Sequence, residues 1–285
     1  MRSRILFLVA AVLLGTGVAL AQQGQLVIYV ADFHVKPGLD EQFMNLVKKH
    51  EQPVFEKLLG EGTVIAWGVD IPVLHRVGAP THSFWWSVPD TAALDKVFAA
   101  LEEMEEKVSD DDAQAGEDAR KRGRPAPKSD QQTFLEIVDI GKHQDYLLRH
   151  LVVGRSSSPP PAGFQPSNWI NLVRVLPGKS EEYRRLWEQY NKPVFDKLVA
   201  EGAIYAYALG TEEARSTDAF THYVVLTLPD LAAREKVRAA FNADRQARTP
   251  AERSIITNSF LNVTDPSASR TEILRTVIYQ TSPPK

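Results

Sequence analysis

Apolar and polar residues alternate along the chain in a pattern that divides it into short strands and amphipathic helices. Residues 26–35 form an apolar, β-branched run that predicts a strand ending at the turn Pro37-Gly38. From Asp40, a suitable N-cap, apolar residues recur at helical spacing as far as Gly62, a suitable helix stop. Pro53 lacks an amide hydrogen, so we expect it to bend this helix.

The pattern continues with strands at 63–69 and 81–88, a helix that begins after Pro89-Asp90, and a closing strand at 147–153. The segment 109–131 is charged and contains prolines, and it is predicted to be a flexible loop. The order of elements is therefore β-α-β-β-α-β, which is typical of a ferredoxin-like module.

The same order recurs 140 residues further on, and 23 of the 71 residues from 37 to 107 are identical to their counterparts in 177–247. The clearest matches join Pro37-Gly38 to Pro177-Gly178, Pro53-Val54-Phe55 to Pro193-Val194-Phe195, Glu61-Gly62 to Glu201-Gly202, Thr81-His82 to Thr221-His222, and Pro89-Asp90 to Pro229-Asp230. This repetition indicates a tandem duplication. We expect a first module at 22–154, a Pro- and Ser-rich linker at 155–167 and a second module at 168–285.

A ferredoxin-like module covers one face of its sheet with helices, so two copies can bury their bare faces against each other as a homodimer would. In the duplicated Pro37-Gly38 turn, the Glu61-Gly62 helix stop and the strand-to-helix step at 81–90, the chain resembles the dimeric α+β barrel superfamily. That superfamily includes cofactor-free quinol monooxygenases, EthD-like and NIPSNAP-like proteins, chlorite dismutases and dye-decolourising peroxidases. The resemblance implies an α+β fold in which one chain forms a pseudo-dimeric barrel. It implies no particular reaction, because these families share a fold and not an active site.

The N-terminus has the pattern of a secretory signal peptide at residues 1–21. Arg2 and Arg4 precede an apolar run at 5–20, and Ala19-Leu20-Ala21 forms a small-residue cleavage site before Gln22. The apolar run is shorter than the ~20 residues that a membrane span requires. We therefore expect an exported protein, periplasmic or secreted, with no membrane contact after cleavage.

Composition excludes several kinds of chemistry. The chain has 285 residues, a net charge of -3 with both signs interspersed, and no cysteine. We expect no nucleic-acid partner, disulfide, iron–sulfur cluster or thiol catalysis. The seven histidines show no HExxH or H-x-H spacing, so no metal site is predicted. No cofactor is predicted either, although haem ligation by a single histidine stays open because of the chlorite dismutase relatives.

Strand alternation suggests which side chains lie between the two sheets. The small residues Ala66, Gly68, Ala206 and Ala208 would allow close packing of helices, which places Trp67, Tyr205 and Tyr207 on the opposite, interior face. On the following strands, Trp85 and Tyr223 face the same interior. These aromatic residues could line a small-molecule pocket or could simply form a core between the sheets.

A functional site in a duplicated protein needs only one copy, so positions where the halves differ are the better candidates. Asp32 and His34 correspond to Leu172 and Arg174, which makes Asp32 and His34 weak catalytic candidates and Arg174 a substrate-binding candidate. The histidine pair His82 and His222 occurs in both copies, which favours a structural role in which each imidazole bonds a neighbouring backbone carbonyl.

We expect an exported protein that binds a small aromatic or apolar molecule between its two sheets. Two alternatives stay open: a cofactor-free monooxygenase-like enzyme acting on a phenolic or quinol substrate, and a purely structural pseudo-dimer without a ligand. An interior cavity larger than ~300 Å³ that reaches solvent would favour a ligand. The sequence does not determine whether the chain assembles beyond the pseudo-dimer.

Overall fold

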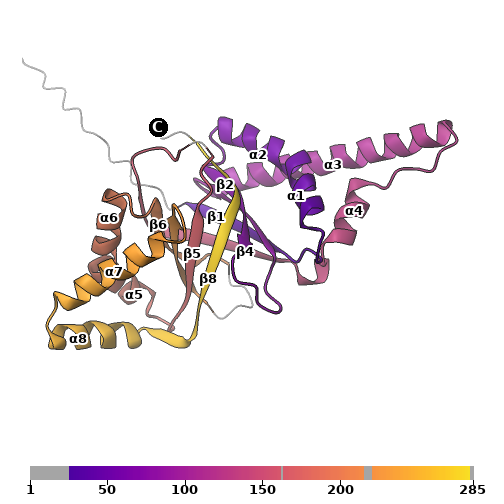
Figure 1. The fold of residues 1–285 in the computed structure, drawn as a ribbon. Coiled ribbons are helices and arrows are strands. Elements are labelled where there is room, and N and C mark those ends of the chain that lie inside the picture. Colours follow the sequence, from indigo (N-terminus) through magenta and orange to yellow (C-terminus); the bar gives the residue numbers. More distant parts are fainter. Residues whose placement is uncertain (1–25, 162, 215–219, 283–285) are drawn as a thin grey trace, which may run out of the picture.

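The computed structural model describes residues 26–161, 163–214 and 220–282 (Figure 1). The predicted signal peptide at 1–21 lies outside these residues. The first half contributes β1 (Val27–Phe33), α1 (Asp40–Lys49), α2 (Glu51–Gly60), β2 (Ala66–Pro72), β3 (His82–Val88), α3 (Thr91–Lys121), α4 (Asp130–Ile137) and β4 (Gln144–Arg155). The second half contributes β5 (Ser167–Val175), α5 (Ser180–Tyr190), α6 (Lys192–Ala200), β6 (Ala206–Glu212), β7 (His222–Leu228), α7 (Ala233–Gln246), α8 (Pro250–Leu261) and β8 (Thr264–Thr281).

The eight strands form one closed antiparallel barrel in the order β1-β3-β2-β8-β5-β7-β6-β4. Within the first half the order is β4-β1-β3-β2, and within the second it is β8-β5-β7-β6. The halves join edge to edge where β2 pairs with β8 and where β4 pairs with β6. Closure pairs both edges of every strand, which removes the exposed edges that two separate sheets would leave. The predicted α+β barrel architecture is therefore confirmed.

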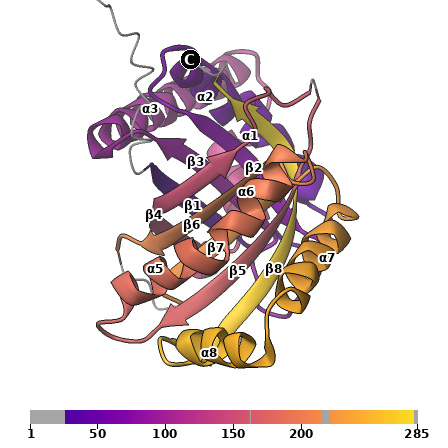
Figure 2. The same ribbon diagram turned by 90° about the vertical axis from the view of Figure 1, so that its left-hand side faces the viewer.

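Helices cover the outside of the barrel in two groups (Figures 1 and 2). Helices α1–α4 pack over the first half and α5–α8 over the second. Buried side chains accordingly form three clusters. One lies between the first helix group and its strands, one lies between the second group and its strands, and a third, smaller cluster around Ile28, Leu148 and Leu172 lies inside the barrel.

The predicted bend at Pro53 is a break between two helices. Helix α1 ends at Lys49 and α2 begins at Glu51, so Pro53 lies in the first turn of α2, where a missing amide hydrogen removes no helical hydrogen bond. Gly62 adopts a φ of 76° just after α2, and its N–H donates to the carbonyl of Leu59 at 3.1 Å. This left-handed conformation is accessible to glycine at little cost, which explains why the helix stops there.

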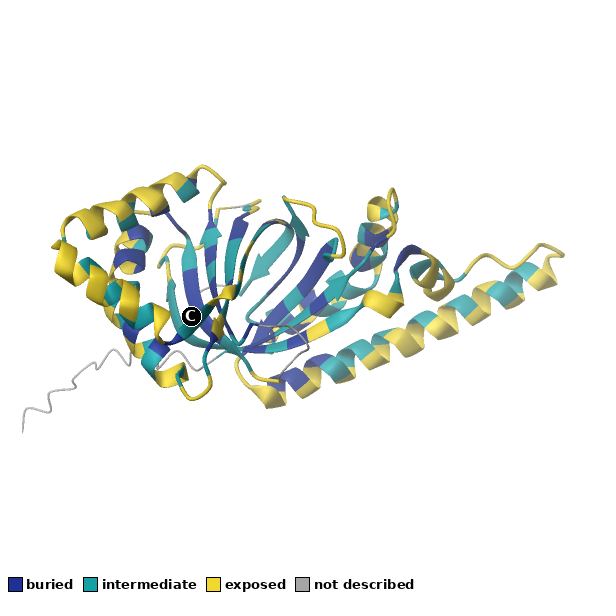
Figure 3. Ribbon diagram, turned by 90° about the horizontal axis from the view of Figure 1, so that it is seen from below, coloured by how far each residue is buried: buried dark blue, intermediate teal, exposed yellow. Residues whose placement is uncertain are grey.

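The prediction of a loop at 109–131 is wrong for residues 109–121, whereas residues 122–129 do connect two helices without regular structure. Helix α3 continues to Lys121 and projects from the barrel with mostly exposed side chains (Figure 3). Its charges lie at helical spacing and support the helix, as in the Glu117–Lys121 ion pair at 2.8 Å. Ser129 then forms a capping box at the start of α4, and Asp112 on α3 accepts a hydrogen bond from the backbone of Asp130 at 3.1 Å. Local pairing and capping therefore outweigh the polar composition.

Candidate functional site

Two of the predicted interior residues do face the inside of the barrel. Tyr223 belongs to the interior cluster, and the ring of Trp85 lies 6.1 Å from that of Tyr279 on β8. Tyr205 lies just before β6, where its ring contacts Phe164 of the segment between β4 and β5 at 5.1 Å. The barrel interior is therefore lined partly by aromatic residues from both halves.

The predicted orientation of Trp67 and Tyr207 is wrong, because both side chains face the helices. Trp67 is fully buried against Phe55 of α2, with ring centroids 5.4 Å apart. Tyr207 packs against Phe195 of α6 at 5.4 Å and donates a hydrogen bond to Asp196. The small residues of the same strands therefore point into the barrel.

The reason for this reversed orientation is the close approach of aromatic rings inside the barrel. A Cβ atom on Gly68 would lie 2.8 Å from the indole of Trp85, and one on Gly210 would lie 2.3 Å from the ring of Tyr223. Such distances are too short for non-bonded carbon atoms. The small residues make room for large neighbours within the narrow barrel rather than for helices outside it.

The polar candidates lie at strand ends and are engaged in local contacts. Asp32 accepts a hydrogen bond from Ser83 at 2.5 Å, and burial together with the nearby Lys142 charge lowers the pKa of His34. Arg174 lies opposite Asp265 of β8. Hydrogen bonds from Ser267 are the main reason why the pKa of Asp265 is lowered, and the charge of Arg174 lowers it further.

The two matched histidines have the same partner at Nδ1 in the two halves, and His82 also has the carboxylate of Asp40 3.9 Å from its Nε2. Both are buried beneath the helices, and each Nδ1 lies 3.0 Å from the hydroxyl of the preceding threonine, Thr81 or Thr221. In each half this threonine oxygen also accepts the N–H of Val35 or Val175, at 2.8 and 2.9 Å. The repeated arrangement agrees with a structural role, but the partner is a hydroxyl group and not the expected carbonyl.

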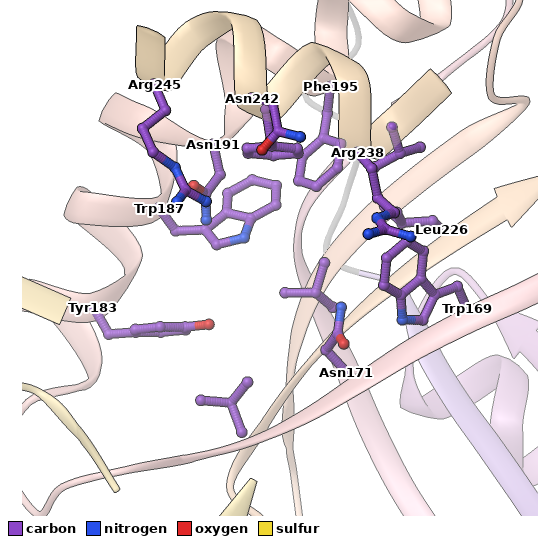
Figure 4. A pocket seen from close by; sticks show the side chains of 14 residues that line it. Trp169, Asn171, Tyr183, Trp187, Asn191, Phe195, Leu226, Arg238, Asn242 and Arg245 are labelled. Atoms are coloured by element: carbon purple, nitrogen blue, oxygen red, sulfur yellow. The ribbon is translucent and has the colours of Figure 1, made fainter. Parts of the chain in front are cut away.

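A cavity of about 510 Å³ lies in the second half, outside the barrel, between α5–α7 and the outer face of β5 and β7 (Figure 4). Its walls are mainly aromatic and aliphatic. It is lined by Trp169, Asn171, Val173, Tyr183, Trp187, Asn191, Phe195, Val224, Leu226, Val237, Arg238, Phe241, Asn242 and Arg245. Of the residues predicted to bind substrate, none belongs to this lining.

The first half shows why the second half has this cavity. In the first half, Tyr29 stacks on Trp86 with ring centroids 4.5 Å apart, and Phe98 meets Tyr29 edge-on at 5.4 Å. The residues 140 positions later are Trp169, Leu226 and Arg238. Two of the three aromatic rings that fill the space in the first half are thus replaced by a smaller and a flexible side chain. A comparison of the two repeats by side-chain volume could have indicated this cavity from sequence.

The two arginines lie at opposite ends of the cavity (Figure 4). Arg245 lies beside Asn191 and Trp187 at one end, and Arg238 lies beside Trp169 at the other. The hydroxyl of Tyr183 points towards the centre. Burial raises the pKa of Tyr183, so its hydroxyl is a neutral hydrogen-bond donor at pH 7.

The histidine nearest to the cavity is His222, whose ring meets Tyr183 edge-on at 5.4 Å. Burial lowers its pKa to about 4, so the imidazole is neutral at pH 7. The cavity therefore offers aromatic faces, neutral hydrogen-bond donors and two guanidinium groups, while its lining residues include neither a carboxylate nor an imidazole.

No protein-family model matches the chain, and no curated protein matches its sequence. Solved structures do share the fold. The crystal structure of a "Putative monooxygenase" from Fusobacterium nucleatum is 11% identical, with a TM-score of 0.58 over 90% of this chain and 95% of that one. A "putative monooxygenase" from Lactobacillus acidophilus is 10% identical, with a TM-score of 0.57 over 90% and 96%. The chain therefore shares the α+β barrel fold of these structures, as the duplicated pattern predicts.

Because the superfamily includes haem proteins, the lining of the cavity can be compared with the ligands that haem iron requires. Those ligands are usually histidine, cysteine or methionine, and less often a tyrosinate. The lining contains none of the first three, and the raised pKa of Tyr183 disfavours its anionic form. These residues do not fit haem. Among the described residues there is also no group of three or more potential metal ligands, and no helix there is long and apolar enough to cross a membrane.

Proposed function

We propose that the protein binds a small planar aromatic molecule in the cavity of the second half. The volume of about 510 Å³ falls within the ~300–1,000 Å³ typical of small-molecule sites, and aromatic walls with a few polar groups are the usual lining. The observation that carries this proposal is the replacement of Trp86 and Phe98 by Leu226 and Arg238 at equivalent positions. The proposed site lies outside the barrel, whereas the sequence suggested a site between the two sheets.

We also propose the domain organisation and the export that the sequence leads us to expect. The equal strand order of the two halves supports a tandem pair of ferredoxin-like modules at 22–154 and 168–285 with a linker at 155–167. Loss of residues 1–21 on export would leave a mature protein that begins at Gln22 and acts in the periplasm or outside the cell. One half then serves as scaffold and the other as the binding module.

A second candidate function is a cofactor-free monooxygenase acting on a phenol or quinol, which the descriptions of the two structural neighbours favour. Such an enzyme must stabilise the deprotonated substrate. Since the lining contains no carboxylate or imidazole, Arg238 and Arg245 would do so by lowering the pKa of the bound hydroxyl group. Oxygen consumption with 1,4-dihydroxynaphthalene as substrate would distinguish an enzyme from a binding protein.

Filling the cavity tests the binding proposal. Leu226→Trp restores the residue of the first half and should abolish binding of 2-naphthol and 2-naphthoate, whereas Leu226→Ile keeps the side-chain volume and should preserve it. Binding can be followed by quenching of tryptophan fluorescence, because Trp169 and Trp187 line the cavity. Unchanged affinity in Leu226→Trp, or no binding of either compound to the wild type, would contradict the proposal.

A further inference from the structure

We propose that the second-half cavity selects an aromatic acid, whose negatively charged group lies at the end formed by Arg245, Asn191 and Asn242. This inference rests on the proposed function, because it assigns the charge of the ligand that the cavity holds. It depends on a different observation, however, namely the charges of the lining rather than the space between the side chains.

The duplicated half provides an internal comparison for these charges. Three polar lining residues, Asn191, Asn242 and Arg245, correspond to three glutamates of the first half, Glu51, Glu102 and Glu105. A fourth lining residue, Arg238, corresponds to Phe98. Each Glu-to-Asn difference adds one positive charge unit, the Glu-to-Arg difference adds two and the Phe-to-Arg difference adds one. In formal charge the lining is thus five units more positive than the same positions of the first half.

The first half also shows how an anion fares at this place. Glu51 occupies the position of Asn191, and its Oε2 atom is buried without a hydrogen-bond partner among the described residues. Burial raises the pKa of Glu51 to about 7, and the charge of Glu105 adds to the effect. A negative charge is therefore disfavoured in the first half. In the second half an amide replaces this buried carboxyl, and a guanidinium replaces its acidic neighbour Glu105, so the neighbouring charge at this place is positive.

The placement of the guanidinium groups suits an anionic ligand. Arg238 and Arg245 are seven residues apart on α7, which is two helical turns, so both reach the same cavity from one helix face. Arg238 has an exposed partner in Glu235 at 3.3 Å, a weak surface pair. In the part of the chain that the structure describes, no ion pair engages Arg245. Its charge is available to a ligand.

The remaining polar groups at this end are able to donate hydrogen bonds. Figure 4 shows the amide of Asn191 and the indole nitrogen of Trp187 next to Arg245, with Asn242 above the rings of Trp187 and Phe195. A carboxylate accepts hydrogen bonds at both oxygens and forms shorter, stronger bonds with a guanidinium than a neutral group does. The aromatic walls would then hold the ring of the ligand, and the donors would hold its acid group.

The test compares 2-naphthoate with 2-naphthamide, a neutral compound of nearly the same shape, by isothermal titration calorimetry. The wild type should bind the acid at least about tenfold more tightly than the amide. Arg245→Glu restores the first-half charge and should remove that preference while leaving the affinity for the amide within about twofold. Arg245→Gln should give an intermediate result. Lys236→Glu is the matched control, because it makes the same change of charge on an exposed residue of α7 outside the cavity.

The outcomes separate this inference from the proposed function. Equal binding of acid and amide to the wild type would overturn the charge assignment and leave aromatic binding intact. An equal loss of naphthoate affinity in Lys236→Glu and Arg245→Glu would show that distant charge, and not the cavity, attracts the acid. If neither compound binds the wild type, the proposed function is wrong and this inference falls with it.

Discussion

His150 should make the folded protein sensitive to mild acid. It lies on β4 with its ring inside the barrel, 5.9 Å from the ring of Tyr223, and its Nδ1 is buried without a hydrogen-bond partner among the described residues. Burial lowers its pKa from 6.5 to about 4. The imidazole therefore stays neutral in the folded state at pH values where the unfolded chain already binds a proton.

The direction and size of the effect follow from this difference in pKa. Above pH 6.5 both states are neutral, so the histidine causes no pH dependence. Between pH 6.5 and 4 only the unfolded state gains a proton, so the free energy of unfolding falls as the pH falls. At about 1.4 kcal/mol per pH unit, the full loss is at most about 3 kcal/mol, of which about 2 kcal/mol is reached by pH 5. These losses in the free energy of unfolding are upper limits because His150 is not completely shielded from solvent.

The variant His150→Phe keeps a ring of similar size and cannot take up a proton. Urea unfolding monitored by tryptophan fluorescence at pH 7.5, 6 and 5 should give similar free energies for wild type and variant at pH 7.5. At pH 5 the wild type should have lost up to about 2 kcal/mol more than the variant. His75→Gln, at an exposed loop position, should behave as the wild type. Parallel pH profiles for wild type and His150→Phe would refute the assignment of a buried, neutral imidazole.

Three further substitutions test the packing. Burial raises the pKa of Asp70, although Asn168 donates a hydrogen bond to its carboxylate at 3.1 Å. Above the ordinary carboxyl pKa, the charged form of Asp70 therefore destabilises the folded state. Asp70→Asn should raise the denaturation midpoint at pH 8 more than at pH 4. Gly68→Ala would place a methyl group 2.8 Å from the Trp85 ring, and a loss of about 1–3 kcal/mol is expected in urea unfolding. Gly116 lies within α3, and a methyl group added there would meet nothing closer than 3.9 Å. Gly116→Ala should stabilise the helix by roughly 0.5–1 kcal/mol and slow amide hydrogen exchange in its projecting part. Unchanged exchange would show that this glycine does not limit the stability of the helix.

The barrel could be predicted from the sequence because its pattern is local and occurs twice. Each strand and helix carries its own apolar period, and glycines such as Gly62 mark the helix ends through a backbone conformation that other residues rarely adopt. The repeat then relates the two halves. The segment 109–121 was predicted wrongly because its charges suggest disorder. The i,i+4 spacing of Glu117 and Lys121 is a local sign of a helix, whereas the contact between Asp112 and the start of α4 becomes visible only when the two segments are placed side by side.

The location of the cavity depends on tertiary structure. Alternation along β2 and β6 separates two faces, but it does not say which face lies inside the barrel. The close approach of Trp85 to Gly68 decides that question, since only a residue without a side chain fits beneath the indole, and this turns Trp67 towards the helices.

The sequence by itself therefore determined most of the elements, their repetition and the fold, because those follow from backbone conformation and local periodicity. Only the tertiary structure decided where open space remains. A cavity arises from several side chains of unequal size that meet from separate elements, as Leu226 of β7 and Arg238 of α7 do where Trp86 and Phe98 close the space in the first half. The volume that such side chains leave between them is a property of their joint packing and of no single segment.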